Sequence, residues 1–280
     1  MSGVCYGDTT IGTNLTVNGI GRGAALNGTG YGNGAGSVVT VTSMFSPSVT
    51  VTLANLTITG GSNGNGGGGI QNQGQGSALT LIGSTVTNNA GGFHGGGIGN
   101  YGGALTLIGS TVTNNTASVD PNGDQGGGIY STRTLTLTGS TVSNNTATSG
   151  GGIFNGQGTV TLNSSIVSGN TATLSSNSCG GSGPGCYDLG GGGIENYGVL
   201  SVKNSLVIAN KAENGGSGGG IYSAPINGPE SLYSLTLTNA IVAFNTVTGG
   251  GTGGGLYWTG TTPPTLTNAI VVANSPTNIN

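Results

Sequence analysis

Apolar residues alternate with small polar ones in short stretches that recur along the chain, with a repeat of roughly 25 to 40 residues. One copy runs from Gly95-Gly96-Gly97-Ile98 through Leu105-Thr106-Leu107 to Thr111-Val112-Thr113-Asn114-Asn115. The period of two within each stretch predicts β-strands, and no stretch shows the period of an amphipathic helix. Because each copy is too small to bury its own apolar face, the copies must stack as a solenoid.

Each copy contains three apolar anchors, which predict three strands. Between Leu81 and Val86 the alternation slips by one residue, so Gly83-Ser84 is predicted to form a corner. We therefore predict an all-β fold, a right-handed parallel β-helix (a single-stranded β-solenoid) with about eight to nine coils and three short strands per coil. The first anchor recurs as Ile70, Ile98, Ile129, Ile153, Ile194, Ile221 and Leu256, and the third as Ile58, Val86, Val112, Val142, Val167, Val207, Val242 and Val271.

The predicted solenoid is a single domain over residues 1–280. It divides into an irregular N-terminal coil (1–35), regular coils (36–274) and an uncapped C-terminal end (275–280). The start, Met1-Ser2-Gly3-Val4, has no charged or apolar signal-peptide region, so we expect export by another element or a longer parent chain.

Two columns of small polar residues recur at fixed places in the repeat. Both are interpreted as structural, because asparagine tolerates the left-handed conformation of a tight corner and its amide can bond to the coils above and below. The first column is Asn89, Asn115, Asn145, Asn170, Asn210, Asn245 and Asn274; the second is Asn72, Asn100, Ser131, Asn155, Asn196 and Ser223.

Charge is scarce along the chain. Charged residues make up 4% of the sequence, the net charge is −3, and there are four lysines and arginines in all. A nucleic-acid partner is not expected, because binding to phosphates needs a basic stripe. No apolar run is long enough to predict a membrane span.

Cys179 and Cys186 bracket the flexible segment Gly-Gly-Ser-Gly-Pro-Gly. We predict a local disulfide between them, which implies an oxidising compartment and an extracellular or cell-surface location. Metal binding by these thiols is not expected, since the only histidine, His94, lies several coils away. Cys5 is left over.

One loop carries a weak calcium motif. Asp120, Asn122 and Asp124 place oxygen ligands at alternate positions, as at the start of a calcium loop. The glycine and the later glutamate of that motif are missing, so a solvated polar turn is the alternative, and no other cofactor is expected. The seven acidic residues are scattered over different coils, so we expect no catalytic pair and no enzyme activity.

Gly126-Gly127-Gly128-Ile129, followed by Leu135-Thr136-Leu137 and Val142-Ser143-Asn144-Asn145, resembles the right-handed parallel β-helix repeats of bacterial surface proteins. It is similar to the repeat of the polymorphic outer-membrane protein family, with Val142 where that family has phenylalanine. The resemblance covers residues 36–274. It implies a secreted or cell-surface passenger, often adhesive or structural, and it carries over no catalytic residue.

Two sets of residues are predicted to point outward. Tyr130, Phe154, Tyr222 and Tyr257 follow the glycine-strand anchor and form either a platform for sugar rings or a ladder that stabilises itself. The third strand is flanked by Thr-x-Thr in the first coils, which resembles the flat faces of ice-binding solenoids. In the last coils it is flanked by an apolar set that predicts a partner surface: Leu206, Ile208, Ile241, Ile270 and Val272.

From these observations we expect a secreted or cell-surface structural or adhesive module. Its partners would be copies of itself, joined laterally or end to end into an assembly or fibre, or surface glycans. The first alternative is an ice-binding protein using Thr85, Thr87, Thr111 and Thr113. The further alternative is a carbohydrate-binding or polysaccharide-degrading β-helix protein.

Overall fold

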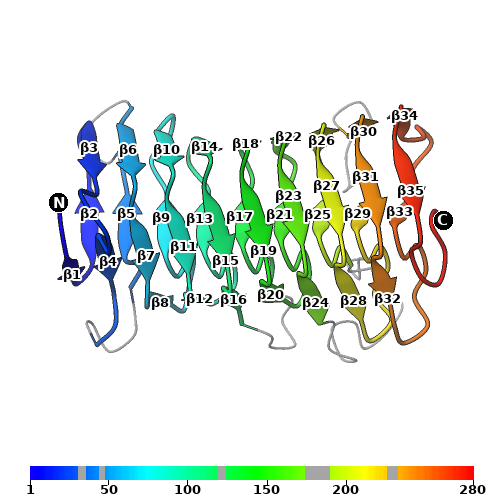
Figure 1. The fold of residues 1–280 in the computed structure, drawn as a ribbon, viewed down its shortest axis with the longest axis horizontal. Helices are drawn as coiled ribbons and strands as arrows, with labels where there is room; N and C mark the ends of the chain where they lie inside the picture. Colours follow the sequence, from blue (N-terminus) through cyan, green and yellow to red (C-terminus); the bar gives the residue numbers. More distant parts are fainter. Residues whose placement is uncertain (31–35, 44–47, 119–123, 174–189, 226–232) are drawn as a thin grey trace.

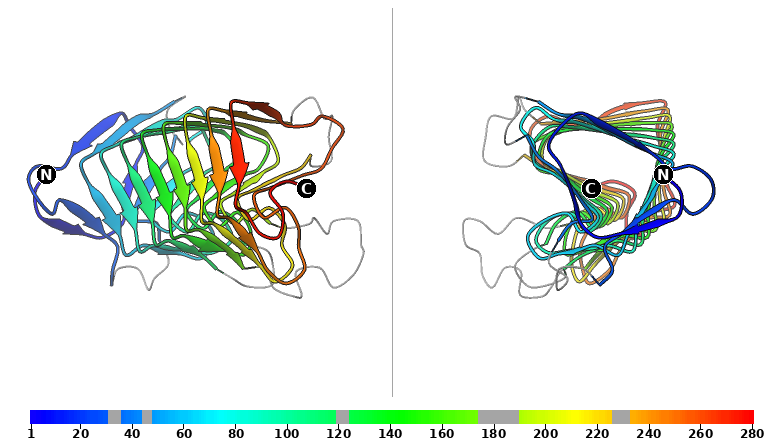
Figure 2. Two further views of the ribbon diagram at one scale, coloured as in Figure 1. Left: turned by 45° about the vertical axis from the view of Figure 1, so that its right-hand side comes forward. Right: turned by 90° about the vertical axis from the view of Figure 1, so that its left-hand side faces the viewer.

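The fold is a stack of parallel coils, as the repeat predicted. The computed structural model describes residues 1–30, 36–43, 48–118, 124–173, 190–225 and 233–280. In this part of the chain the secondary structure is entirely β, and the strands form four parallel sheets along the long axis (Figure 1). Two of the sheets have nine strands each, which matches the predicted eight to nine coils. Viewed end-on, successive coils largely superimpose (Figure 2).

Three of the sheets correspond to the three predicted strands of each copy. The Thr sheet consists of β1 (Val4–Tyr6), β4 (Ala25–Asn27), β7 (Thr57–Thr59), β11 (Thr85–Thr87), β15 (Thr111–Thr113), β19 (Thr141–Ser143), β23 (Ile166–Ser168), β27 (Leu206–Ile208), β31 (Ile241–Ala243) and β35 (Ile270–Val272). The Leu sheet consists of β3 (Leu15–Asn18), β6 (Thr50–Ala54), β10 (Ala78–Ile82), β14 (Ala104–Ile108), β18 (Thr134–Thr138), β22 (Thr159–Asn163), β26 (Val199–Lys203), β30 (Ser234–Thr238) and β34 (Thr265–Thr267). The Ile sheet consists of β2 (Thr9–Ile11), β5 (Val39–Val41), β9 (Ile70–Asn72), β13 (Ile98–Asn100), β17 (Ile129–Ser131), β21 (Ile153–Asn155), β25 (Ile194–Asn196), β29 (Ile221–Ser223) and β33 (Leu256–Trp258).

The fourth sheet corrects the prediction of three strands per coil. Its strands follow the corner asparagine and have only two or three residues, so they offer a single inward side chain and no visible alternation. This short-strand sheet consists of β8 (Ser62–Asn63), β12 (Ala90–Gly91), β16 (Thr116–Ala117), β20 (Thr146–Ala147), β24 (Thr171–Thr173), β28 (Lys211–Glu213) and β32 (Thr246–Val247).

The core is a narrow column of aliphatic side chains. Equivalent residues of neighbouring coils pair in register, so that Val86 lies on Val112 and Val112 on Val142. All three of these valines are fully buried. The stability of each coil therefore depends on the coils above and below it rather than on a central core of its own.

A ladder of buried asparagines runs along the corner after the Thr sheet. The backbone N and the Nδ2 of Asn115 both donate to Oδ1 of Asn145, each at 3.0 Å, and Nδ2 also donates to the carbonyl oxygen of Val86. The pattern repeats from Asn89 to Asn274. The predicted ladder is confirmed, but the left-handed residue is the one before it, as at Asn114 (φ 55°) and Asn144 (φ 54°).

The three glycines before each Ile strand are required by close packing of successive coils. A Cβ on Gly128 would lie 2.9 Å from Nδ2 of Asn145, and a Cβ on Gly127 would lie 2.4 Å from the carbonyl oxygen of Gly151. Gly126 adopts a left-handed φ of 71°. Side chains at these places would push the asparagine ladder and the next coil away.

A serine column, which the sequence analysis did not single out, supports the corner between the Leu and Thr sheets. The buried hydroxyl of Ser140 accepts a bond from the backbone N of Ser110 at 3.1 Å, and Ser165 does the same for Ser140. The hydroxyls thus satisfy backbone amides that the turn leaves without a strand partner. The column comprises Ser84, Ser110, Ser140, Ser165 and Ser205.

Both terminal segments are more regular than the sequence predicted. Within residues 1–35, β1 to β4 already join the three long sheets. Residues 275–280, predicted as an uncapped end, return along β33: the backbone N of Leu256 donates to Asn278 at 2.9 Å, and that of Asn280 donates to Leu256 at 3.0 Å. Asn278 also accepts a bond from Asn274, the last asparagine of the ladder. These contacts cover the edge of β33, whereas β34 and β35 are the last strands of their sheets.

The ladder yields a first prediction. Replacing Asn145 with alanine removes the acceptor for two donors of Asn115 and the donor to Val112, all of them buried. We expect a loss of about 3 kcal/mol in the free energy of unfolding, measured by denaturant titration. The matched control is Asn144→Gly, which suits the left-handed backbone and should change stability by less than about 0.5 kcal/mol. Equal losses in the two variants would contradict the assignment.

Candidate functional site

The outer face of the Thr sheet changes character along the molecule. In the first coils two ranks of threonines flank the buried valines, and they are aligned by the register of β7, β11, β15 and β19. These hydroxyl-bearing side chains are half-buried, and Ser143 donates to Thr113 across the coils at 3.1 Å. From β23 onward, aliphatic side chains replace most of them.

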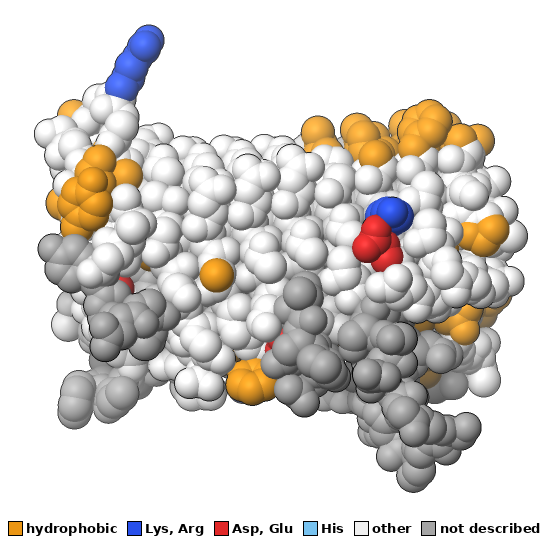
Figure 3. All heavy atoms as spheres, turned by 90° about the horizontal axis from the view of Figure 1, so that it is seen from below, with side chains coloured by type: hydrophobic (Ala, Val, Ile, Leu, Met, Phe, Trp, Pro, Cys, Tyr) orange, Lys and Arg blue, Asp and Glu red, His pale blue; other side chains and the backbone are white. Residues whose placement is uncertain are grey.

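The aliphatic side chains of this face form a surface that is named here the apolar patch. Ile241 is 36% exposed, Ile270 53% and Val272 46%. Leu206 and Ile208 are half-buried beside them, and Ala243, in the same column as Ile208 and Val272, is buried. Figure 3 shows hydrophobic side chains along the upper edge at the C-terminal end of the molecule and a separate group at the N-terminal end, with few between them. With one residue that the sequence analysis missed, the apolar patch comprises Leu206, Ile208, Ile241, Phe244, Ile270 and Val272.

Phe244 is that missed residue. It occupies the left-handed corner position that holds asparagine in earlier coils, with φ of 58°, and its side chain is 66% exposed. A bulky residue in this conformation costs about 1–2 kcal/mol relative to residues that adopt it readily. Because the ring is mostly exposed, burial of its apolar surface does not offset this cost. The contribution of Phe244 to folding therefore does not explain its presence at this corner. The signal in the sequence was the break in the column Asn88, Asn114, Asn144, Gly169, Ala209, Phe244 and Ala273.

The predicted aromatic column lies on the outer side of the Ile sheet, but its rings face one another rather than solvent. Tyr130 and Phe154 stack with centroids 5.3 Å apart, and so do Tyr222 and Tyr257. Tyr130, Phe154 and Tyr222 are less than a tenth exposed, while Tyr257 is half-buried. A sugar platform needs an open ring face, so this geometry is that of the self-stabilising ladder.

Two tyrosines from the following turns complete this ladder. Tyr101 fills the space beside Gly99, where a Cβ would lie 2.7 Å from the tyrosine ring, and its centroid is 5.4 Å from that of Tyr130. Tyr197 lies between Phe154 and Tyr222, at centroid distances of 5.6 and 6.0 Å. In the sequence, each of them comes two residues after a position of the aromatic column that holds no aromatic residue: Tyr101 follows Gly99, and Tyr197 follows Glu195.

Glu195 occupies the position of the aromatic column between Phe154 and Tyr222, and its side chain is fully buried. Its Oε1 accepts a hydrogen bond of 2.6 Å from the hydroxyl of Tyr197. Burial raises the pKa of Glu195 to about 8, although the Tyr197 hydrogen bond acts in the opposite direction. The carboxyl is therefore neutral at neutral pH, which suits its position among aromatic rings. Burial also lowers the pKa of His94, whose ring lies 4.2 Å from that of Tyr130.

The other predicted sites fall largely outside the described residues. This applies to Asp120 and Asn122 of the calcium motif and to both cysteines of the predicted disulfide, Cys179 and Cys186. Asp124 is described and is 1% exposed. Cys5 is exposed on β1. Over the described ranges, no group of three or more His, Cys, Asp or Glu side chains is arranged to hold a metal ion.

Comparisons with known proteins add no family to this picture. No family model matches the chain, and no match is found among curated proteins or solved structures. In the part of the chain that the structure describes, no helix is long and apolar enough to cross a membrane. Functional inference therefore rests on the surface of the molecule, where folding does not explain the exposed side chains of the apolar patch.

Glu195 generates a prediction on pH. The folded carboxyl keeps its proton up to about pH 8, whereas the unfolded one releases it near 4.5. Unfolding therefore releases a proton between these values, and the free energy of unfolding should fall as pH rises through this window. Glu195→Gln cannot ionise and should gain on the order of a few kcal/mol relative to the wild type between pH 5 and pH 8. Denaturation midpoints at the two pH values measure this difference.

Glu213→Gln is the matched control, because Glu213 lies on the surface of the short-strand sheet in an ion pair with Lys211 at 2.6 Å. It should not reproduce the gain. A Glu195→Gln variant whose advantage is the same at pH 5 and pH 8 would show that the buried carboxyl does not bind its proton as described.

Proposed function

We propose that the protein is an extracellular structural and adhesive module that associates laterally with copies of itself through the apolar patch. The observation that carries this proposal is Phe244, an exposed ring held in a strained backbone conformation at the edge of the patch. Such strain at an exposed residue costs stability and is typical of sites kept for interaction rather than for folding. The repeat's resemblance to bacterial surface passengers supports the extracellular setting.

The geometry of the patch favours a second copy as its partner. It lies on a regular β-sheet whose side chains are aligned in columns, so two such faces can pack together as in a sandwich of sheets. A net charge of −3 over 280 residues gives little repulsion between copies. An apolar face of several contiguous large side chains is uncommon on a monomer and marks an interaction site.

The patch predicts opposite effects of one substitution on stability and on association. Phe244→Asn restores the residue found at this corner in earlier coils and should raise the free energy of unfolding by about 1 kcal/mol. The same change removes an exposed ring from the interface and should weaken association. Denaturant titration measures the first effect and sedimentation velocity over a concentration series measures the second. If Phe244→Asn associates as strongly as the wild type, Phe244 is not part of the interface.

A charged pair of substitutions tests the whole patch. Ile241→Lys with Ile270→Lys should leave the core intact, since both side chains point outward, and should convert the assembly to a monomer. The control is Thr85→Lys with Thr111→Lys, which adds the same charge to the same sheet away from the patch. A wild-type protein that remains monomeric at every concentration would end the proposal of self-association.

Ice binding is a second candidate, favoured by the register of the threonine ranks. Thr85 and Thr87 lie directly on Thr111 and Thr113, so their hydroxyls repeat with the coil spacing on a sheet that is half-exposed. A regular array of hydroxyl and methyl groups supports this candidate, while threonine is also an ordinary β-branched residue for a half-buried strand surface.

This candidate predicts thermal hysteresis that depends on a flat array. Replacing Thr87 and Thr111 with tyrosine should abolish it, because each ring would hold the surface away from ice. Thr136→Tyr, on the outer face of the Leu sheet, serves as control. Equal freezing and melting temperatures in the wild-type protein would remove the candidate.

A further inference from the structure

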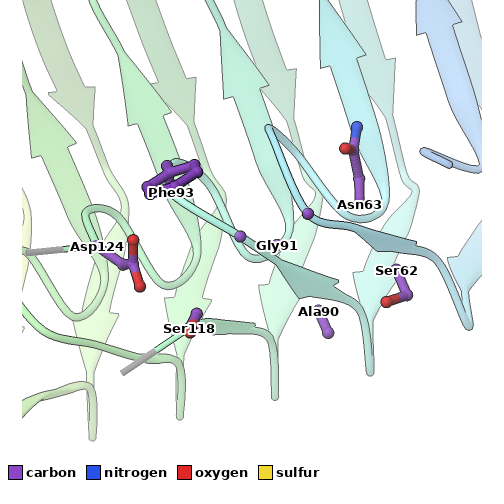
Figure 4. Close-up of a pocket in the computed structure, with 9 residues that line it drawn as sticks. Ser62, Asn63, Ala90, Gly91, Phe93, Ser118 and Asp124 are labelled. Atoms are coloured by element: carbon purple, nitrogen blue, oxygen red, sulfur yellow. The ribbon is translucent and has the colours of Figure 1, made fainter. Parts of the chain in front are cut away.

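A hollow of about 290 Å³ lies beside the short-strand sheet in the first half of the chain. Figure 4 shows Phe93 and Asp124 at one end of it and Ser62 and Asn63 at the other. It is at the lower end of the size of ligand pockets, which run from about 300 to 1,000 Å³, so it fits a single ring rather than a chain. It is lined by Ser62, Asn63, Gly64, Ala90, Gly91, Gly92, Phe93, Ser118 and Asp124.

Two successive coils have glycine at the same position beside the hollow, where later coils have a hydroxyl-bearing residue. Strand β8 pairs with β12 so that Asn63 lies beside Gly91. The next residues along the chain, Gly64 and Gly92, therefore occupy equivalent positions in the two coils. The equivalent residue in the following coils is Ser118, Thr148 and Thr173. A Cβ on Gly64 would meet nothing within 4 Å, whereas one on Gly92 would lie 1.9 Å from the carbonyl oxygen of Gly64.

The walls of the hollow are fixed by hydrogen bonds. Nδ2 of Asn63 donates to Oγ of Ser37 at 2.9 Å and to Oε1 of Gln71 at 2.8 Å. Its Oδ1 accepts a bond from the backbone N of Asn65 at 3.0 Å. On the opposite side, the backbone N of Ser118 donates to the carbonyl oxygen of Gly91 at 2.9 Å. A ligand would therefore enter a preformed site and would not have to order it.

The lining offers one aromatic face and several neutral polar groups. Phe93 is 46% exposed, and the hydroxyl-bearing residues Ser62 and Ser118 are exposed as well. None of the described lining residues is basic, so none of them offers an anion a partner. Among the described lining residues, the acidic Asp124 is 1% exposed and lies behind the surface. The complementary ligand is neutral, with an apolar C–H face and hydroxyls around its rim.

We propose that this hollow binds one neutral pyranose ring, with its C–H face on Phe93 and its hydroxyls toward Ser62, Ser118 and the glycine backbone. A sugar residue has this combination of a flat apolar face and peripheral hydroxyls, and an exposed aromatic ring is the side chain that matches it. The site lies on a different sheet from the apolar patch and in the opposite part of the chain. It does not depend on self-association, and either proposal can fail while the other stands.

Saturation-transfer difference NMR with glucose, galactose, mannose, xylose and N-acetylglucosamine tests the site. At least one of these sugars should receive saturation, strongest at the C–H protons of one ring face. Phe93→Ala should weaken its binding by about tenfold. Gly64→Leu should abolish binding by filling the hollow, and it should fold normally because the added side chain meets open space.

Two matched controls separate this site from the rest of the surface. Gly12→Leu introduces the same side chain at a glycine whose nearest neighbours lie 4.0 Å from the added Cβ, and it should leave sugar binding unchanged. Tyr6→Ala removes an exposed ring that belongs neither to the hollow nor to the apolar patch, and it should also leave sugar binding unchanged. The proposal is overturned if none of the five sugars receives saturation, or if Gly64→Leu, with wild-type circular dichroism, binds as the wild type does.

Discussion

The close packing of the asparagine ladder against the glycine column is the constraint on which the rest of the structure depends. The side-chain amide of Asn145 is typical of the ladder. Its oxygen accepts two hydrogen bonds from Asn115 in the coil before it, and its nitrogen donates to Val112 in that coil and to Asn170 in the coil after it. That arrangement fixes the register of every coil, and it leaves no room for a Cβ at Gly128 and its counterparts. The glycine-rich composition is therefore a consequence of tight stacking between ordered coils and not a mark of disorder.

Because stacking energy comes from columns that point inward, the outer positions are free to change without loss of the fold. The Thr sheet illustrates this: its central residue, isoleucine in β7 and valine from β11 to β31, stays buried, while most flanking residues change from threonine to isoleucine, leucine and valine. The corner position before the ladder changes in the same direction, from asparagine to Gly169, Ala209 and Phe244. A scaffold held by inward columns can thus carry different surfaces on successive coils of the same sheet.

The sequence predicted the features that repeat and missed those that depend on one contact in space. The coils, their buried anchors and the asparagine ladder all follow from periodicity, which survives small errors at any single position. The short-strand sheet was missed because two residues such as Ala90-Gly91 carry no alternation. The aromatic column was placed correctly along the chain, but its burial depends on Tyr101 and Tyr197, which reach it from neighbouring turns. The hollow beside Phe93 was not predicted because its lining comes from residues of successive coils that only the stacking brings together.

Departures from the repeat are therefore the informative positions in a chain of this kind. Most of its residues are explained by stacking, and a residue that obeys the pattern says little about function. Phe244 breaks the corner column at a cost in backbone energy, Glu195 breaks the aromatic column at a cost in desolvation, and the pair Gly64 and Gly92 breaks a column of hydroxyl-bearing residues. Folding alone favours asparagine at the first place and an aromatic ring at the second, while at the third Gly64 has room for a side chain and Gly92 does not. Two of these departures lie at the surface: Phe244 at the apolar patch and the Gly64–Gly92 pair at the hollow. Interaction is therefore assigned to those two surfaces and not to the regular faces between them.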